Sequence, residues 1–174
     1  MVELREKTLP TRAFIDEARA LKAMLAPLRI PLIVNDRADV ALAVDADGLH
    51  VGQNDMPLTM ARALLGPGRI IGLSIDALDQ LAAADAQAAD YLGIGPIFAQ
   101  ATKGDAAPPL GLDGLSAARR LSARPLMAIG GVDAGNARAL REAGADGLAV
   151  GSAIVAAEDP QVATRAIAEA FAGS

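Results

Sequence analysis

The sequence predicts a parallel α/β fold, a TIM (β/α)₈ barrel that lacks its first strand–helix unit. Segments patterned like buried strands alternate strictly with segments of helical periodicity, which gives seven strand–helix units over the 174 residues. Polar residues and glycines follow directly after these strands, at the end where a parallel barrel carries its working groups. An open, doubly wound sheet is the alternative. A short sequence pattern that occurs three times, together with the strand-end residues, favours the barrel.

One short pattern occurs three times, at residues 46–52, 89–95 and 145–151. Each copy begins with Ala-Asp, continues into an apolar run and ends at a glycine, and each follows an Ala-rich segment of helical periodicity. A short continuous apolar run is typical of a strand buried on both faces of a parallel sheet. Each copy therefore predicts a helix, an acidic turn and a buried strand with glycine at its carboxyl end.

The remaining elements fill the gaps between these copies. Further strands are expected at residues 2–4, 30–34, 69–73 and 125–129. Helices are expected at residues 11–21, 36–44, 57–65, 77–88, 112–122, 134–143 and 159–172. Pro57 and Pro160 lie near helix starts, where a missing N–H costs little, and Gly144 suits a helix C-cap. The longest irregular stretch, residues 98–111, is long enough to be a functional loop.

Composition narrows the class of protein. We expect a single domain over residues 1–174, since 52% of the residues are apolar and this rules out disorder. The formal charge of −5 argues against a nucleic-acid partner, which requires a basic face. No Cys is present, so a disulfide framework and a thiol nucleophile are excluded. Neither a signal peptide nor an apolar run of about 18 residues is found, so we expect a cytoplasmic protein with no membrane partner.

Glycines at two successive strand ends predict a phosphate site. Gly130 and Gly131 follow the strand at 125–129, and Gly151 and Ser152 follow the last strand. Exposed backbone N–H groups near helix starts bind anions, and phosphate sites after the last two strands are frequent in this architecture. The alternative is that these glycines only permit tight turns.

Two early carboxylates predict a cation site. Asp36 and Asp55 each follow a predicted strand, and two carboxylates without a His or Cys partner suit a hard cation, most simply Mg²⁺. In the alternative, Asp36 pairs with Arg37 or caps the next helix, and Asp55 is an N-cap before Pro57.

Three cations would add positive charge beside that metal: Arg5, Lys7 and Lys103. In the alternative, these three side chains are ordinary charges on the solvated surface. His50, the only histidine, lies within a strand and is expected to be a core or supporting residue rather than a base. No P-loop motif is present. The residues thus indicate a Mg²⁺-assisted reaction on a small phosphorylated or diphosphorylated molecule.

The chain also resembles a known family, the thiamine phosphate synthases. The resemblance is carried, in matching order and spacing, by residues 4–7, 32–37, 47–55, 93–98, 102–103, 128–132 and 152–154. It implies a TIM barrel that joins a pyrimidine diphosphate to a thiazole phosphate, giving thiamine monophosphate and diphosphate. It also implies a dissociative reaction, in which the C–O bond to diphosphate breaks before the thiazole nitrogen attacks the resulting carbocation.

The resemblance assigns roles by position. It implies Mg²⁺ held by Asp36 and Asp55, and catalytic cations at Lys103, Arg5 and Lys7. Substrate contacts are implied for Glu3, Leu4, Arg5, Glu6, Lys7, Asn35, Ser74, Gln100, Ala101, Thr102, Lys103, Gly131, Gly151 and Ser152. Asn35 and Ser74 would contact the pyrimidine diphosphate, whereas residues 100–102, Gly131, Gly151 and Ser152 would hold the thiazole phosphate.

The chain departs from the family pattern at four places. Glu3 replaces a glutamine, Ala99 and Gln100 alter the long loop, Asp76 stands where a polar or His residue is common, and the first strand and helix are absent. A thiazole tautomerase-like isomerase and a weakly catalytic, phosphate-binding remnant are therefore alternatives. Asn35-Asp36 and Asp76 favour the synthase, because the tautomerase branch lacks the Asn-Asp pair and carries a catalytic His after the serine. A barrel with an open seam also leads us to expect a homo-oligomer.

Overall fold

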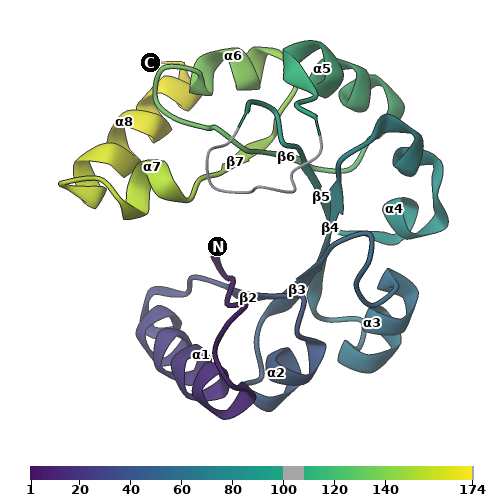
Figure 1. Cartoon of the computed structure of the whole chain (residues 1–174), viewed down its shortest axis with the longest axis vertical. Coiled ribbons are helices and arrows are strands. Elements are labelled where there is room, and N and C mark those ends of the chain that lie inside the picture. Colours follow the sequence, from purple (N-terminus) through teal and green to yellow (C-terminus); the bar gives the residue numbers. More distant parts are fainter. Residues whose placement is uncertain (100–107, 174) are drawn as a thin grey trace. The chain divides into compact units, whose positions relative to one another are not determined.

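The chain is described by a computed structural model over residues 1–99 and 108–173. Strands and helices alternate along it, as Figure 1 shows. The residues group into two compact units. The first contains residues 1–74 and 88–90, and the second contains the rest of the described chain.

The first unit is a parallel sheet in chain order with helices between its strands. Its elements are β1 (Val2–Leu4), α1 (Thr11–Leu25), η1 (Ala26–Leu28), β2 (Leu32–Asn35), α2 (Ala38–Ala43), β3 (Gly48–Val51), α3 (Leu58–Leu65) and β4 (Ile70–Ile75), whose last residue belongs to the second unit. Asn35 of β2 is in register with His50 of β3, and His50 is in register with Gly72 of β4. Residues two apart on a strand share a face, so Ser74 lies on the same face one step further along.

The second unit repeats this plan. Its elements are η2 (Leu78–Ala82), α4 (Ala84–Ala88), whose last residue belongs to the first unit, β5 (Tyr91–Ile94), α5 (Gly111–Leu121), β6 (Leu126–Ile129), α6 (Ala137–Glu142), β7 (Gly147–Ala149), α7 (Ser152–Val155) and α8 (Pro160–Ala172). Strands β5, β6 and β7 are parallel and in chain order, with Gly93 opposite Met127 and Ala128 opposite Leu148. Helix α8 packs against α6 and α7 (Figure 1).

Small side chains of the helices are buried in the core. Ala18 of α1, Ala61 of α3, Ala118 of α5 and Ala137 of α6 are each fully buried. A core with few aromatic residues needs such close approach, because alanine lets a helix lie near the strands without leaving a gap. Within the described ranges, every helix falls short of the length and apolar content needed to cross a membrane.

The predicted alternation is confirmed, with differences at element ends. All seven expected strands form, although the strand expected at 30–34 is Leu32–Asn35 and that expected at 69–73 continues to Ile75. The helix expected at 77–88 is wrong as one element: extended backbone at Ala83 separates the 3-10 helix η2 from α4. Helix α1 runs to Leu25 rather than residue 21, and α7 and η1 were not predicted.

The predicted helix boundaries at two special residues are confirmed. Pro160 occupies the first turn of α8, where Asp159 accepts hydrogen bonds from the N–H groups of Gln161 and Val162. Gly144 follows the end of α6 with φ +105°, a conformation that favours glycine.

The repeated Ala-Asp pattern has a structural explanation, which we call the aspartate clasp (Asp47 with Leu32, Asp90 with Ile71, Asp146 with Leu126). Each aspartate donates its N–H to the carbonyl of the neighbouring strand residue at 2.8–2.9 Å. Its carboxylate accepts the N–H of that same residue at 2.7–2.8 Å. The clasp therefore satisfies a strand-start N–H group, and two bonds to a single residue fix the register.

In two clasps the aspartate also forms an ion pair with an arginine of a preceding helix. Arg62 of α3 pairs with Asp90 at 2.6 Å, and Arg119 of α5 pairs with Asp146 at 2.7 Å. Each guanidinium also donates to a carbonyl just before the next strand, Arg62 to Arg69 and Arg119 to Arg124. The helix is thus tied to both the aspartate and the strand start.

Replacing Asp146 by alanine should therefore destabilise the fold. The change leaves the Leu126 N–H and the Arg119 guanidinium without their carboxylate partner. We expect the free energy of unfolding to fall by about 1–3 kcal/mol. Urea denaturation followed by circular dichroism measures this change.

Asp16→Ala is the matched control, since Asp16 pairs with Arg19 at 3.9 Å and both side chains are exposed to solvent. Its effect should stay within about 1 kcal/mol. Equal losses in the two variants would contradict a special role for the clasp.

Candidate active site

Two aspartates lie at the carboxyl ends of neighbouring strands in the first unit. Asp36 follows β2 directly, in the left-handed region with φ +63°, and its N–H donates to the carbonyl of His50 at 2.8 Å. Asp55 lies in the turn after β3, where its carboxylate accepts the N–H of Gly52 at 2.8 Å. The turn thus directs Asp55 back toward the strand end.

The electrostatics show that these carboxylates interact. Burial, a hydrogen bond with the Asp55 carboxyl and the negative charge of Asp55 together raise the pKa of Asp36 above its ordinary value. Lys7 opposes this shift, since its Nζ lies 3.4 Å from Oδ2 of Asp36. The structure therefore brings Asp55 and Lys7 to Asp36, and metal binding by the two aspartates stays a prediction.

The alternatives for these aspartates are wrong. Arg37 pairs with Asp39 at 2.6 Å, and α2 begins without a side-chain cap, so Asp36 serves neither purpose. Helix α3 has Pro57 at its N-cap and no side-chain cap, so Asp55 is not its cap.

The donor set fits a hard cation with few protein ligands. Two like charges held close together are relieved by a positive ion, and carboxylate oxygens are the ligands that Mg²⁺ prefers. No cluster of three or more metal-ligating side chains occurs in the described part of the chain. A bound Mg²⁺ would therefore complete its shell with water and substrate oxygens, as this ion commonly does.

Ser74, at the end of β4, is held at two atoms. Its hydroxyl lies 2.9 Å from Nε2 of His50, and its carbonyl accepts from the side-chain amide of Gln53 at 2.6 Å. His50 and Asn35 are both buried, at 7% and 8% exposure. His50 is thus the supporting residue that the sequence indicates, and Gln53 takes part in the site although the resemblance gave it no role.

The segment after β1 carries the remaining first-unit residues. Glu3 and Arg5 are exposed, whereas Leu4, the last residue of β1, and Glu6 are partly buried. The Glu6 carboxylate accepts hydrogen bonds from the N–H and hydroxyl of Thr8 and from the N–H of Leu9, which lower its pKa to about 2. Glu6 therefore shapes the turn after β1, and substrate contact by residues 3–6 stays a prediction.

In the second unit the predicted glycines form turns after the strands, in which Gly131 is exposed and Gly130 is buried. Gly130 and Gly131 have φ of +98° and +67°, so the tight turn after β6 requires glycine. The side-chain amide of Asn136 donates to the Gly131 carbonyl at 2.7 Å and holds this turn. Gly151 and Ser152 are exposed at the start of α7. Phosphate binding at these residues stays a prediction, and Gln100, Ala101, Thr102 and Lys103 lie outside the described residues.

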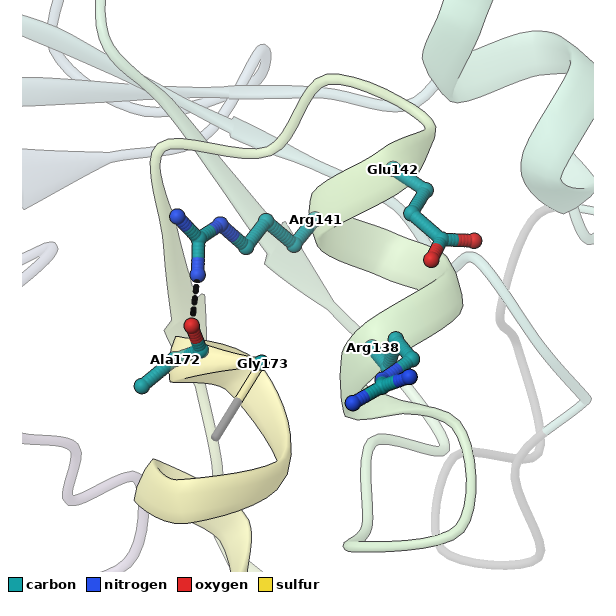
Figure 2. A pocket seen from close by; sticks show the side chains of 5 residues that line it. All are labelled: Arg138, Arg141, Glu142, Ala172 and Gly173. Atoms are coloured by element: carbon teal, nitrogen blue, oxygen red, sulfur yellow. Dashed lines mark hydrogen bonds between the residues drawn. The ribbon is translucent and has the colours of Figure 1, made fainter.

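A separate open pocket of about 430 Å³ lies between α6 and the end of α8, lined by Arg138, Arg141, Glu142, Ala172 and Gly173. Figure 2 shows the Arg141 side chain reaching the carbonyl of Ala172, and it also donates to Phe171 at 3.0 Å. Arg141 thus caps α8, and no predicted site residue lines this pocket.

Parallel strands with carboxylates, a lysine and glycine turns after their carboxyl ends are typical of enzymes of the α/β-barrel class. The family profile described as thiamine monophosphate synthase matches residues 1–154. The chain belongs to the thiamine monophosphate synthase family.

Named relatives agree with this assignment. The thiamine-phosphate synthase of Albidiferax ferrireducens is 56% identical over 93% of this chain and 74% of its own length. That of Chloroflexus aurantiacus is 53% identical over 95% of this chain and 76% of its own length.

A solved structure supports the fold class. The thiamine phosphate pyrophosphorylase from Pyrococcus furiosus superimposes with a TM-score of 0.89 and 37% identity, covering 98% of this chain and 82% of the other. A 3-hexulose-6-phosphate synthase structure, at TM-score 0.69 and 23% identity, shares the fold alone. The predicted TIM-like α/β class is confirmed.

The electrostatics of Asp36 predict that Asp36→Asn stabilises the metal-free chain. A raised pKa in the folded state means that protonation of Asp36 stabilises the fold. This stabilisation is fully present below the ordinary Asp pKa, and it is lost as the pH rises through the raised value. Asparagine resembles the protonated form. We expect a higher Tm than the unmutated chain at pH 8, with the difference vanishing near pH 3.

Asp39→Asn is the control of opposite sign, because its hydrogen bond to Arg37 lowers the pKa of Asp39. This variant should have a lower Tm at pH 8. Thermal unfolding in a chelating buffer measures both, and a lower Tm for Asp36→Asn would contradict the interaction of the two carboxylates.

Proposed function

We propose that this chain joins 4-amino-5-hydroxymethyl-2-methylpyrimidine diphosphate to hydroxyethylthiazole phosphate, giving thiamine monophosphate and diphosphate with the assistance of Mg²⁺. The observation that carries the proposal is the meeting of Asp36, Asp55 and Lys7 at the carboxyl ends of β2 and β3. Family membership and the named relatives support the transferase activity.

The reaction requires stabilisation of a leaving anion rather than a general base. The C–O bond breaks with its electron pair going to diphosphate, and the lone pair of the thiazole nitrogen then forms the new C–N bond with the pyrimidine carbocation. Mg²⁺, when bound, would neutralise charge on the departing diphosphate. The chain's own groups must therefore hold that anion and keep the carbocation facing the second substrate.

The first unit supplies the groups for the diphosphate. Asp36 and Asp55 would hold the cation, and Lys7, which lies 3.4 Å from Asp36, would contact a diphosphate oxygen. Arg5 adds a second cationic contact, which suits its fork of N–H donors. Asn35 and Ser74 contact the pyrimidine diphosphate from the ends of β2 and β4.

The second unit supplies the groups for the thiazole phosphate. Backbone N–H groups of Gly131, Gly151 and Ser152 bind its oxygens, a role that exposed glycine turns suit. Gln100, Ala101 and Thr102 join them, and Lys103 contacts the diphosphate. These four residues lie outside the described part of the chain, and their roles are proposed from the sequence.

The two alternatives meet different objections. A thiazole tautomerase-like isomerase would use a histidine that follows the serine in the sequence, but position 76 is Asp, which hydrogen-bonds with Gln80. The only histidine, His50, is buried against Ser74. A phosphate-binding remnant would retain the glycine turns but form no product. Only an activity assay therefore distinguishes it from the synthase.

The direct test is an assay with the purified chain, both phosphorylated substrates and Mg²⁺, followed by chromatography of thiamine monophosphate. We expect product that disappears when EDTA removes the metal. Ligand-induced stabilisation without product would leave only the binding remnant.

Removing either aspartate should abolish this turnover. Asp36→Ala and Asp55→Ala are each expected to reduce product formation by about 100-fold or more, since the cation loses one of its two protein ligands. Circular dichroism should show both variants folded. Asp79→Ala, at an exposed residue of η2, is the control and should retain normal turnover. Normal rates in both site variants would refute the metal assignment.

Three broader expectations accompany this proposal. A location in the cytoplasm, a homo-oligomer and a single domain over residues 1–174 remain predictions from the sequence. Size-exclusion chromatography with light scattering measures the oligomeric state.

A further inference from the structure

Three strands place a row of polar residues on one face of the first unit's sheet. Asn35 is in register with His50, and His50 is in register with Gly72. Gly72 carries no side chain, so the His50 imidazole meets no side chain at its register position on β4. It instead lies 2.9 Å from the hydroxyl of Ser74, two residues further along that strand.

The Ser74 backbone is held independently of its hydroxyl. Gln53, two residues after the end of β3, donates its side-chain amide to the Ser74 carbonyl at 2.6 Å. His50 and Gln53 therefore fix the side chain and the main chain of the same residue from one neighbouring strand and its turn.

We propose that His50 and Gln53 are positioning residues that fix Ser74 so that its hydroxyl hydrogen points at the bound diphosphate. The inference rests on the proposed function, because it takes Ser74 as a contact to the pyrimidine diphosphate. It assigns roles to two residues that the resemblance did not include among the substrate contacts.

The chemistry of the ligand determines the direction of the His50–Ser74 hydrogen bond. Diphosphate oxygens only accept hydrogen bonds, so Ser74 can help hold the anion only by donating its hydroxyl hydrogen. That hydrogen is available when Nε2 of His50 carries the ring hydrogen and donates it to Oγ of Ser74. In the other neutral tautomer Nε2 accepts the Ser74 hydrogen, and the hydroxyl presents only lone pairs to the anion.

Nitrogen-15 NMR tests the tautomer directly. His50 is the only histidine in the chain, so its two ring nitrogens give unambiguous signals. At pH 8 we expect hydrogen on Nε2, both in the free chain and with inorganic diphosphate and Mg²⁺ added. Hydrogen on Nδ1 in the complex would overturn the proposal.

A double-mutant cycle tests whether His50 acts through Ser74. Calorimetry with the pyrimidine diphosphate gives the Kd of each variant without requiring turnover. His50→Leu removes the donor and is expected to weaken binding about tenfold, whereas His50→Gln, which retains an N–H donor, should recover most of the loss. In a Ser74→Ala background the His50→Leu change should have little further effect. Independent, additive losses would overturn the proposal.

Gln53 is tested against a matched glutamine. Gln53→Met removes the bond to the Ser74 carbonyl, and Gln87→Met removes the same kind of bond, from Gln87 to the Leu81 carbonyl at 2.9 Å. We expect Gln53→Met to raise both the Kd and the KM for the pyrimidine diphosphate, with the KM for the thiazole phosphate unchanged. Gln87→Met should change neither. Equal effects of the two variants would show a general loss of stability and would overturn the role of Gln53.

These measurements separate the inference from the proposed function. Absence of product from the unmutated chain refutes the synthase, whereas the tautomer and the binding cycle still decide the role of His50. Product formation with additive His50 and Ser74 effects retains the synthase and rejects the positioning role.

Discussion

The aspartate clasp is the interaction on which the rest of the structure depends. A parallel strand begins with an N–H group that needs a partner, and Asp47, Asp90 and Asp146 supply one with a carboxylate while bonding the same residue through the backbone. A slip of one residue would break both bonds and turn every side chain to the opposite face. The register that places Asn35 beside His50 at one end of the sheet is therefore held by a carboxylate at the other.

The candidate site shows the opposite use of carboxylates. In the clasps each aspartate accepts hydrogen bonds from nearby donors, whereas Asp36 lies against the negative charge of Asp55, and Lys7 pairs with Asp36. Such crowding opposes folding of the metal-free chain, and a bound cation would relieve it. The same side-chain type thus stabilises the amino ends of the strands and, at the carboxyl ends, supplies the oxygens that the proposed cation would need.

The sequence predicted the strands, the glycine turn after β6 and the residues at the strand ends, because these follow from local apolar runs and from a family pattern. It did not predict what the repeated aspartates bond, since Asp90 and Ile71 are 19 residues apart and their pairing is set by the sheet. The contact between His50 and Ser74 likewise depends on register and on the bare position at Gly72. The divided helix at 77–88 was missed because alanine-rich periodicity does not reveal the extended residue at Ala83.

The clasps recur at every second strand, joining β2 to the residue before β3, β4 to the residue before β5, and β6 to the residue before β7. In a chimaeric chain assembled from two relatives, a junction between clasped pairs keeps each carboxylate and its amide from the same parent. A junction inside a clasped pair takes the carboxylate from one parent and the amide from the other. Two strand–helix units, rather than one, are therefore the piece of this fold that can be exchanged intact.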